Sequence, residues 1–161
     1  MHDIEAAKKK AAAENKDLFI DFTGSDWCGW CIKLNEEVFD HDAFRKGIDA
    51  NYVLVALDFP RGAEPKAKVP NPKRNEELKN KYGVRDFPTI FLMSADGVVY
   101  GQTGYQPGGP EAYLKHIDEL RSTGRVELER VQAVVNAYKA APEADKAAGM
   151  GAILDALDKL P

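Results

Sequence analysis

The chain has 161 residues, of which 44% are hydrophobic and 30% are charged, and its formal net charge at pH 7 is −4. This length suits one domain with room for an appendage, and the composition is that of a soluble globular protein. Because the chain is acidic overall and no apolar run approaches the roughly 20 residues that span a bilayer, we expect no nucleic-acid partner and no membrane insertion.

The first half of the chain predicts alternating helices and strands. The expected elements are a helix over 3–16, a strand over 18–22, helices over 28–38 and 42–48, and a strand over 52–59. Ala, Lys and Glu, which are good helix formers, dominate the first segment. Both strands are short, nearly unbroken apolar runs, the pattern of strands buried on both faces. Ser25 or Asp26 can cap the helix that begins at Cys28.

The composition changes over residues 60–74, which contain four prolines and almost no apolar side chains. We expect an inserted loop here. Five of its residues are cationic and one, Glu64, is acidic, so it carries a local excess of four positive charges. Because it follows the strand 52–59, we expect it to lie beside the end of the strand 18–22 and to favour acidic partners. A solvated loop without a binding role is the alternative.

The second half predicts a strand hairpin followed by helices. The expected elements are a helix over 75–83, strands over 88–94 and 98–104, a helix from Pro110 to about Ser122, and two further helices on either side of Pro142. The Ala-Asp-Gly turn joins the two strands. Apolar stripes continue after Gly124, and we expect the last two helices to pack as an α-hairpin against the domain or a second copy, without a role in chemistry.

This order of elements indicates an α/β fold. Strands separated by helices imply parallel pairing, and the hairpin adds an antiparallel edge. We therefore predict a mixed four-stranded sheet flanked by helices on both faces over residues 3–122, with the inserted loop at 60–74, and a C-terminal helical extension over 125–160.

The two cysteines of the chain, Cys28 and Cys31, lie within one helical turn, and a tryptophan precedes each of them. A purely structural disulfide is disfavoured, because closing so short a loop contributes only about 2 kcal/mol of stability. A closed zinc site needs about four ligands, and the histidines, at positions 2, 41 and 116, have no spacing that completes one. We expect no metal, although a site shared between two chains stays an alternative.

A redox role fits the position of the pair best. A thiol at a helix N-terminus faces unpaired backbone N–H groups and the positive end of the helix dipole, which together favour the thiolate. We expect Cys28 to be accessible and to attack a substrate disulfide. We expect Cys31, one turn further, to be buried and to resolve the mixed disulfide.

The wording WCGWC after LFIDF, together with DFPT at 86–89, resembles the thioredoxin superfamily, in particular its bacterial thioredoxin-like and disulfide-isomerase-like branch. The resemblance covers about residues 3–122. It implies a protein-disulfide oxidoreductase, a reductase or an isomerase, that needs no bound cofactor. It also implies protein disulfide or dithiol substrates, and a reductant or redox partner protein that recycles the pair. A non-catalytic binding module that senses redox state is the alternative.

The resemblance also implies a substrate site around the dithiol. Pro88 matches the family's cis-proline, which would face the cysteines. Phe87 would offer its backbone to an extended substrate, and Gly104 would let that chain lie close. The apolar rim of the site would come from Trp27 and Trp30 on either side of Gly29. Simple core or rim packing is the alternative for Phe87.

Two departures from the family pattern concern the chemistry. Asp21 is the candidate for the family's buried carboxylate, but it lies one residue further from Cys28 than the thioredoxin pattern expects, and the strand 52–59 has no lysine to pair with it. Burial without a cation would raise its pKa and let it accept the Cys31 proton, or it could simply form a hydrogen bond in a turn. Trp30 stands where thioredoxins have proline and disulfide isomerases have histidine, so the redox potential cannot be assigned.

The start of the chain has no apolar segment of the kind found in a secretory signal peptide. Two compartments are consistent with this, the cytoplasm and an exported location reached with a signal that is absent here. The resemblance favours the periplasm, with the cytoplasm as the alternative.

Overall fold

The structure is a computed structural model and describes residues 1–142 and 146–158. Its elements, in chain order, are α1 (Ile4–Glu14), β1 (Asp17–Thr23), α2 (Gly29–Leu34), the π-helical turn η1 (Asn35–Phe39), α3 (Asp42–Asp49), β2 (Tyr52–Asp58), α4 (Ala63–Lys68), α5 (Pro72–Lys81), β3 (Thr89–Met93), β4 (Val99–Thr103), α6 (Gly109–Ala140) and α7 (Lys146–Leu157). The four predicted strands are confirmed to within one residue at each end.

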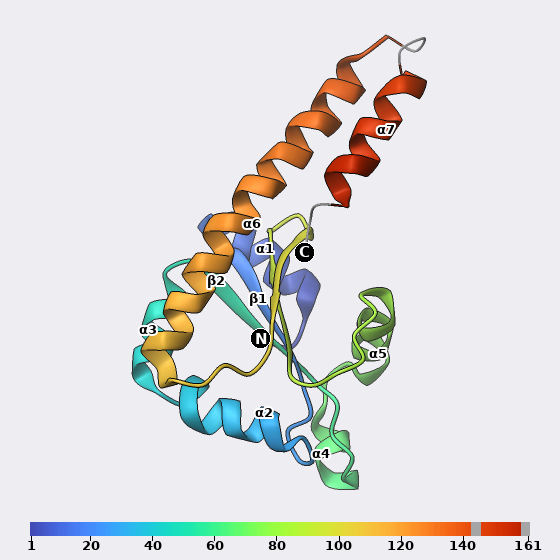
Figure 1. The fold of residues 1–161 in the computed structure, drawn as a ribbon. Coiled ribbons are helices and arrows are strands. Elements are labelled where there is room, and N and C mark those ends of the chain that lie inside the picture. Colours follow the sequence, from blue (N-terminus) through green and yellow to red (C-terminus); the bar gives the residue numbers. More distant parts are fainter. Residues whose placement is uncertain (143–145, 159–161) are drawn as a thin grey trace.

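The sheet has the order β2-β1-β3-β4. It is mixed, as predicted, and Figure 1 shows β1 and β2 side by side. β1 and β2 are parallel, with Ile20 opposite Val55. The expected parallel pairing of the third strand is wrong, because β3 runs antiparallel to both β1 and β4. The connection through α4 and α5 returns to the end of the sheet that it left, so that Thr89 at the start of β3 lies opposite Phe22 near the end of β1.

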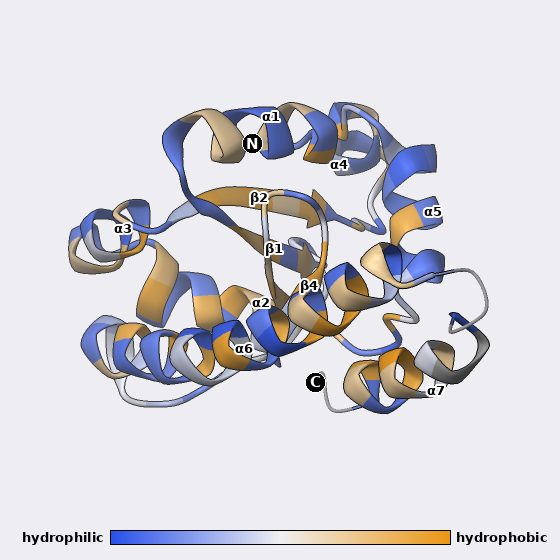
Figure 2. Cartoon of the chain, turned by 90° about the horizontal axis from the view of Figure 1, so that it is seen from above, coloured by the Kyte–Doolittle hydropathy of each residue, from blue (hydrophilic) through white to orange (hydrophobic). Residues whose placement is uncertain are grey.

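Helices cover both faces of the sheet (Figure 2). One face packs against α1 and α5, and its core contains Ala7, Phe22 and Leu78. The other face packs against α2, η1, α3 and α6, where Phe19 and Phe44 lie in the core. Successive residues of β1 point to opposite faces, and all seven are buried, which explains why apolar residues dominate both faces of this strand.

The helix expected over 28–38 is divided into two parts. Its regular part, α2, ends at Leu34, and the chain continues as η1, where the Asp40 N–H donates to the Asn35 carbonyl. The wider turn leaves Val38 buried in the core below the helix. Ser25 and Asp26 do not cap this helix, because Cys28 is its N-cap residue.

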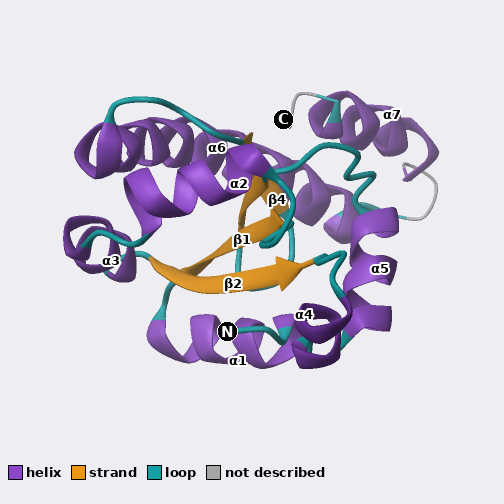
Figure 3. Ribbon diagram, turned by 90° about the horizontal axis from the view of Figure 1, so that it is seen from below, coloured by secondary structure: helices purple, strands orange, loops and turns teal. Residues whose placement is uncertain are grey.

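The prediction of a loop over 60–74 is wrong, since this stretch contains α4 and the start of α5. The prediction relied on the four prolines, but two of them lie at helix starts. Pro65 lies in the first turn of α4 and Pro72 is the first residue of α5, positions where no helical N–H is needed. Figure 3 shows β2 ending toward these two helices, so the expected position of the segment beside the end of the sheet is confirmed.

The helix expected to end near Ser122 instead continues to Ala140 as α6. Its far half and α7 pack against each other as the expected α-hairpin. The hairpin projects from the domain, away from α2, so its expected packing against the domain is not seen in the described residues, and packing against a second copy stays a prediction (Figure 1). The proposed domain boundary between 122 and 125 therefore lies inside a helix, and the division of the chain stays a prediction. Residues 143–145, 159 and 160 of the predicted extension lie outside the described residues. No helix in the described part of the chain is long and apolar enough to cross a membrane.

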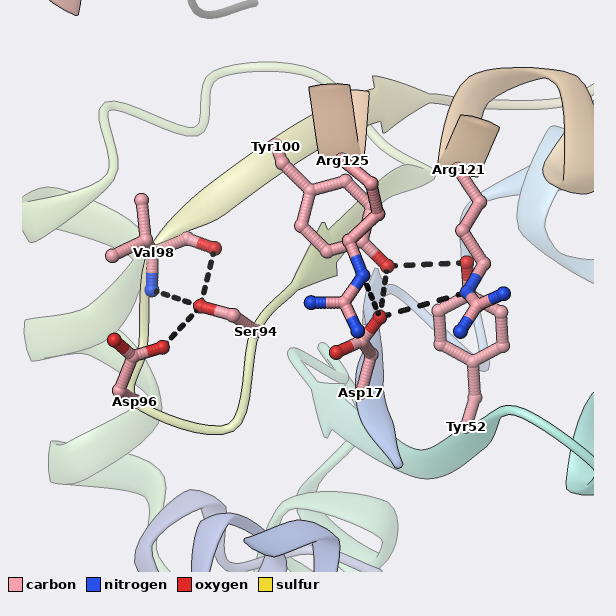
Figure 4. A network of polar contacts seen from close by, with 8 residues as sticks. All are labelled: Asp17, Tyr52, Ser94, Asp96, Val98, Tyr100, Arg121 and Arg125. Carbon is pink, nitrogen blue, oxygen red and sulfur yellow. Dashed lines mark hydrogen bonds and ion pairs between the residues drawn. The ribbon is translucent and has the colours of Figure 1, made fainter. Parts of the chain in front are cut away.

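Polar contacts tie α6 to the sheet at the point where the helix leaves it (Figure 4). The buried Asp17 carboxylate lies 3.6 Å from Arg121 Nε and 3.4 Å from Arg125 Nε. The Tyr100 hydroxyl donates to Asp17 Oδ2 at 2.7 Å and lies 3.2 Å from the Tyr52 hydroxyl. One carboxylate thus joins the start of β1 to two arginines one helical turn apart.

Gly124 allows this close approach, and its replacement by alanine should destabilise the protein. A Cβ atom at this position would lie 2.0 Å from the Tyr100 carbonyl oxygen, which is backbone and cannot rotate away. We expect Gly124→Ala to lower the free energy of unfolding by about 2–3 kcal/mol, as overpacking does. The control is Gly151→Ala in α7, where the added methyl meets no atom within 4 Å and should stabilise by about 0.5–1 kcal/mol. Urea unfolding of both variants tests this, and equal effects would contradict it.

Candidate active site

The two cysteines lie at the first turn of α2, next to the end of β1. Cys28 has an extended backbone and is the N-cap, and its Sγ accepts a hydrogen bond from the Cys31 N–H at 3.2 Å. The two sulfurs are joined in a disulfide. Cys28 is 6% exposed and Cys31 is 2% exposed, so in this oxidised form Cys28 is less accessible than expected. The helix N-terminus around Cys28 is the environment that favours a thiolate.

Two aspartates anchor the turn that leads into the cysteines. Asp58, at the end of β2, accepts hydrogen bonds from the Ser25 N–H at 3.0 Å and from its hydroxyl at 2.6 Å. The Asp26 carboxylate accepts from the backbone N–H groups of Arg61 and Gly62 at 2.6–3.1 Å. The Arg61 bond is the main reason why the pKa of Asp26 is below its ordinary value. The turn and the start of the 60–74 segment therefore hold each other in place.

Trp27 forms one side of the site. Its indole N–H donates to the Phe59 carbonyl at 2.8 Å, and its ring contacts Phe87 edge to face with 5.7 Å between centroids. The Arg61 guanidinium lies 3.6 Å from the centre of the same ring. These contacts fix an aromatic surface directly before Cys28.

The position of Trp27 depends on Gly24, which gives a further prediction. A Cβ atom on Gly24 would lie 2.6–2.9 Å from three atoms of the indole ring. We expect Gly24→Ala to push the ring away from Phe59 and Phe87, and to change the near-ultraviolet circular dichroism of a Trp30→Phe background, in which Trp27 is the remaining tryptophan. Gly83→Ala is a control for a strained backbone, because Gly83 has a φ of +64° but no neighbour near its Cβ position. An unchanged spectrum for Gly24→Ala would contradict this role.

Trp30 lies in the first turn of α2 and is 56% exposed. Its ring centroid lies 5.0 Å from that of Tyr105, and Lys33 Nζ lies 5.3 Å from the first ring and 5.1 Å from the second. The Tyr105 hydroxyl donates to Glu37 at 2.6 Å. Residues from α2, η1 and the segment after β4 thus form an aromatic shelf that faces solvent.

Pro88 and Gly104 lie against each other in the structure. The Phe87–Pro88 peptide bond is cis. A Cβ atom on Gly104 would lie 3.0 Å from the Pro88 carbonyl oxygen, so this position favours glycine. Gly29 is the first residue of α2 and has open space around its Cβ position. The structure therefore packs Trp27 against Phe87, the residue before Pro88, and leaves space at Gly29.

Comparison with known proteins identifies the fold family. The family described as Thioredoxin-like domain matches residues 4–121. The chain belongs to this thioredoxin-like family. Among curated proteins it is 33% identical over 112 residues to "Disulfide bond reductase DsbH" of Chlamydia pneumoniae, a match that covers 69% of this chain and 66% of the relative. It is 26% identical over 126 residues to "Thioredoxin-related protein DsbJ" of the same organism, covering 73% of this chain but only 35% of that protein.

A solved structure supports the same assignment. "DsbH Oxidoreductase" has a TM-score of 0.62 and 30% sequence identity to this chain, and the match covers 71% of this chain and 78% of the other. The thioredoxin-like fold and the disulfide-isomerase-like branch predicted from the sequence are thus confirmed. The matched segment ends where α6 leaves the sheet, so the α-hairpin lies beyond it.

Asp21 of this thioredoxin-like domain is buried on the face of β1 that packs against α2, η1 and α6. Among the described residues its Oδ1 has no hydrogen-bond partner, and its partner on β2 is Ala56 rather than a lysine. Burial, and then the negative charge of Asp58, raise its pKa to about 7. Its burial without a cationic partner on β2 is as expected, and its role as proton acceptor stays a prediction.

Sequence reasoning missed several residues of the site. Phe59 was assigned to a buried strand, but its ring lies 5.3 Å from that of Phe87 and its carbonyl holds Trp27. Asp26 was assigned to a helix cap and instead binds the backbone after β2. The sequence does contain a signal for these two residues. Asp26 follows β1 and Phe59 follows β2, and the carboxyl ends of neighbouring parallel strands meet at one edge of the sheet. No cluster of three potential metal ligands occurs in residues 1–142 and 146–158.

Proposed function

We propose that this protein is a thiol–disulfide oxidoreductase that acts on protein disulfides through Cys28 and Cys31. The observation that carries the proposal is the position of the pair, at the N-terminal turn of α2 and joined by a disulfide. The relative DsbH of Chlamydia pneumoniae, which matches this chain over 112 residues, is named a disulfide bond reductase, and this supports the same chemistry. The match covers 66% of that relative. We therefore assign its reductase activity to this chain as part of the proposal.

The reaction follows from the inequality of the two cysteines. The Cys28 thiolate attacks one sulfur of the substrate disulfide, and the other substrate sulfur leaves as a thiolate that takes up a proton. Cys31 then gives its proton to a base, for which Asp21 is our candidate, and attacks Cys28 Sγ. The second substrate thiol leaves, and two electrons have passed from the dithiol to the substrate. An external dithiol must reduce the new Cys28–Cys31 disulfide before another cycle.

Substrate binding is assigned to the surfaces around the dithiol. Trp27, Phe87, Pro88 and Gly104 would form a surface for an extended polypeptide, and Trp30 would add apolar area across from it. Gly29 between the two tryptophans keeps the approach to Cys28 open. Exposed aromatic side chains bind apolar segments with little loss of side-chain entropy.

The substrates would be protein disulfides, and recycling would need a reductant or a redox partner protein. We place the protein in the periplasm or another exported compartment, with the cytoplasm as the alternative. Whether it acts as a reductase or an isomerase depends on its redox potential, which a titration against glutathione measures. No bound cofactor enters the proposed reaction.

Turnover tests the proposal. In amounts far below the substrate, the reduced protein should accelerate the reduction of insulin disulfides by dithiothreitol, measured as the turbidity of the released chains. The variant that lacks both thiols, Cys28→Ser with Cys31→Ser, is the control for surface effects. If the protein does not exceed this variant, it is a binding module with a redox-sensitive cysteine pair rather than an enzyme.

A further inference from the structure

A groove of ≈ 680 Å³ lies beside Trp27, and Trp30 is not among the residues that line it. Its apolar wall is formed by Trp27, Phe59 and Phe87, whose rings contact one another. Trp27 precedes Cys28 and Phe87 precedes Pro88, so the groove begins where a substrate disulfide must bind. Its opposite wall comes from α4, α5 and the turn between them, which lie beside the end of β2 (Figure 1).

Positive charge dominates the rim of this groove. The cations that line it are Arg61, Lys66, Lys79 and Arg85, and the carboxylates are Asp58 and Glu76. Asp58 accepts two hydrogen bonds from Ser25, and Glu76 pairs with Lys79 at 2.6 Å. In residues 1–142 and 146–158, neither Lys66 nor Arg85 has a carboxylate within ion-pair distance. These two exposed cations therefore give the groove an uncompensated positive charge.

The rest of the basic 60–74 segment contributes less than its sequence suggests. Lys68 pairs with Glu64 at 2.7 Å, and Arg74 pairs with Glu5 at 3.1 Å. The charge that faces the site thus comes in part from Arg85, which lies outside that segment and only two residues before Phe87. The electrostatic asymmetry of the site is a property of the folded groove rather than of one loop.

We propose that this groove binds an acidic segment of the protein substrate that flanks the reacting cysteine and also carries an apolar side chain. The inference rests on the function proposed above, because the bound segment must be next to the substrate cysteine whose sulfur reacts with Cys28. The apolar side chain would pack against the three aromatic rings, and the carboxylates would pair with Lys66 and Arg85. A guanidinium can bind a carboxylate through two hydrogen bonds, which favours acidic over merely polar segments. The volume of ≈ 680 Å³ lies within the range of pockets that bury small ligands, about 300–1,000 Å³.

Binding without chemistry tests the groove separately from the enzyme. The ligands are fluorescent peptides with serine in place of the reacting cysteine, flanked by Glu-Phe-Asp in one peptide and Lys-Phe-Lys in the other. Fluorescence anisotropy with the oxidised wild-type protein should show that the acidic peptide binds at least about five-fold more tightly, the size expected from two partly exposed ion pairs. The ratio should shrink as sodium chloride rises from about 20 mM to about 500 mM.

A double variant locates the preference. Lys66→Gln with Arg85→Gln should bring the affinity ratio to within about two-fold of one. The matched control removes two positive charges elsewhere, by Lys46→Gln in α3 with Lys115→Gln in α6, and should keep the ratio of the wild type. Equal affinities in the wild type, or a ratio that survives the loss of Lys66 and Arg85, would overturn the proposal.

Disulfide forms of the two peptides, with the reacting cysteine restored, test the groove and the oxidoreductase activity separately. If the wild type reduces both peptides at the same rate and binds both equally, the enzyme stands and the groove assignment is wrong. If the groove prefers the acidic peptide but the wild type reduces neither, the oxidoreductase proposal fails and the bound segment is not that of a substrate, so the inference as stated is also wrong. Faster reduction and tighter binding of the acidic peptide support both.

Discussion

Replacing Cys28 with serine should abolish the reduction of protein disulfides, with a loss on the order of 10³-fold or more, as is typical when an enzyme loses its nucleophile. Serine has nearly the same shape, and its hydroxyl can still accept the Cys31 N–H as the helix cap. The fold should therefore stay intact while the thiolate is lost. Circular dichroism and thermal unfolding of the reduced proteins check that the variant folds.

Replacing Cys31 with serine should have a different effect. Cys28 can still attack a substrate, but nothing displaces the substrate from the mixed disulfide. We expect a covalent complex with an oxidised protein substrate that survives non-reducing electrophoresis and disappears with dithiothreitol. The Cys28→Ser variant is the matched control, because its buried Cys31 should form little such complex.

Alkylation of the reduced wild-type protein tests the same inequality directly. Cys28 is at the start of the helix and is the more exposed residue, although both are buried in the oxidised form. We expect iodoacetamide at neutral pH to label Cys28 well before Cys31, as mass spectrometry of the peptides would show. Equal labelling rates would contradict the assignment of nucleophile and resolving residue.

Replacing Asp21 with asparagine should change how the stability of the protein depends on pH. Burial and Asp58 raise the pKa of this carboxyl from an ordinary value of 3.8 to about 7, so between these values the folded protein binds a proton that the unfolded chain releases. The free energy of unfolding of the wild type should therefore fall as pH rises from 4 to 8. The shift corresponds to about 4 kcal/mol over this window.

The asparagine variant has no group to titrate at this position, so its stability should lack this fall. The informative quantity is the difference between variant and wild type, which should move in favour of the variant by about 4 kcal/mol between pH 4 and pH 8. This comparison cancels any constant cost of placing an amide beside the apolar core. Urea unfolding of both proteins at the two pH values measures it, and a difference independent of pH would contradict the raised pKa.

The same variant should slow catalysis if Asp21 accepts the Cys31 proton. We expect the second step, release of the substrate from the mixed disulfide, to slow by roughly 10²-fold, the lower range for loss of a general base. The first step should change little, because Cys28 reacts as a thiolate. Rapid-quench measurement of both steps separates them. Loss of the first step alone, or no loss of either, would show that Asp21 is a buried structural residue and not a base.

The sequence by itself determined the local features of this protein. Nearly unbroken apolar runs predicted β1 and β2. β1 is buried on both faces, whereas β2 is buried on one face and half-buried on the other. The spacing of Cys28 and Cys31 predicted two thiols in one helical turn, since one turn of helix brings such residues together whatever the rest of the fold. Pro88 was located by its motif, and Asp21 by being a charged residue within an apolar strand.

Only the tertiary structure decided the features that depend on distant segments. The direction of β3 follows from where α5 ends, which no local pattern encodes. The continuity of α6 past Ser122 depends on Gly124 fitting against Tyr100, and on arginines that reach Asp17 at the start of β1. Likewise, the groove exists because Phe59 and Phe87 meet Trp27 across the ends of different strands. Such contacts join residues far apart in the chain, so helical and strand periodicity, which extend over a few residues, could not predict them.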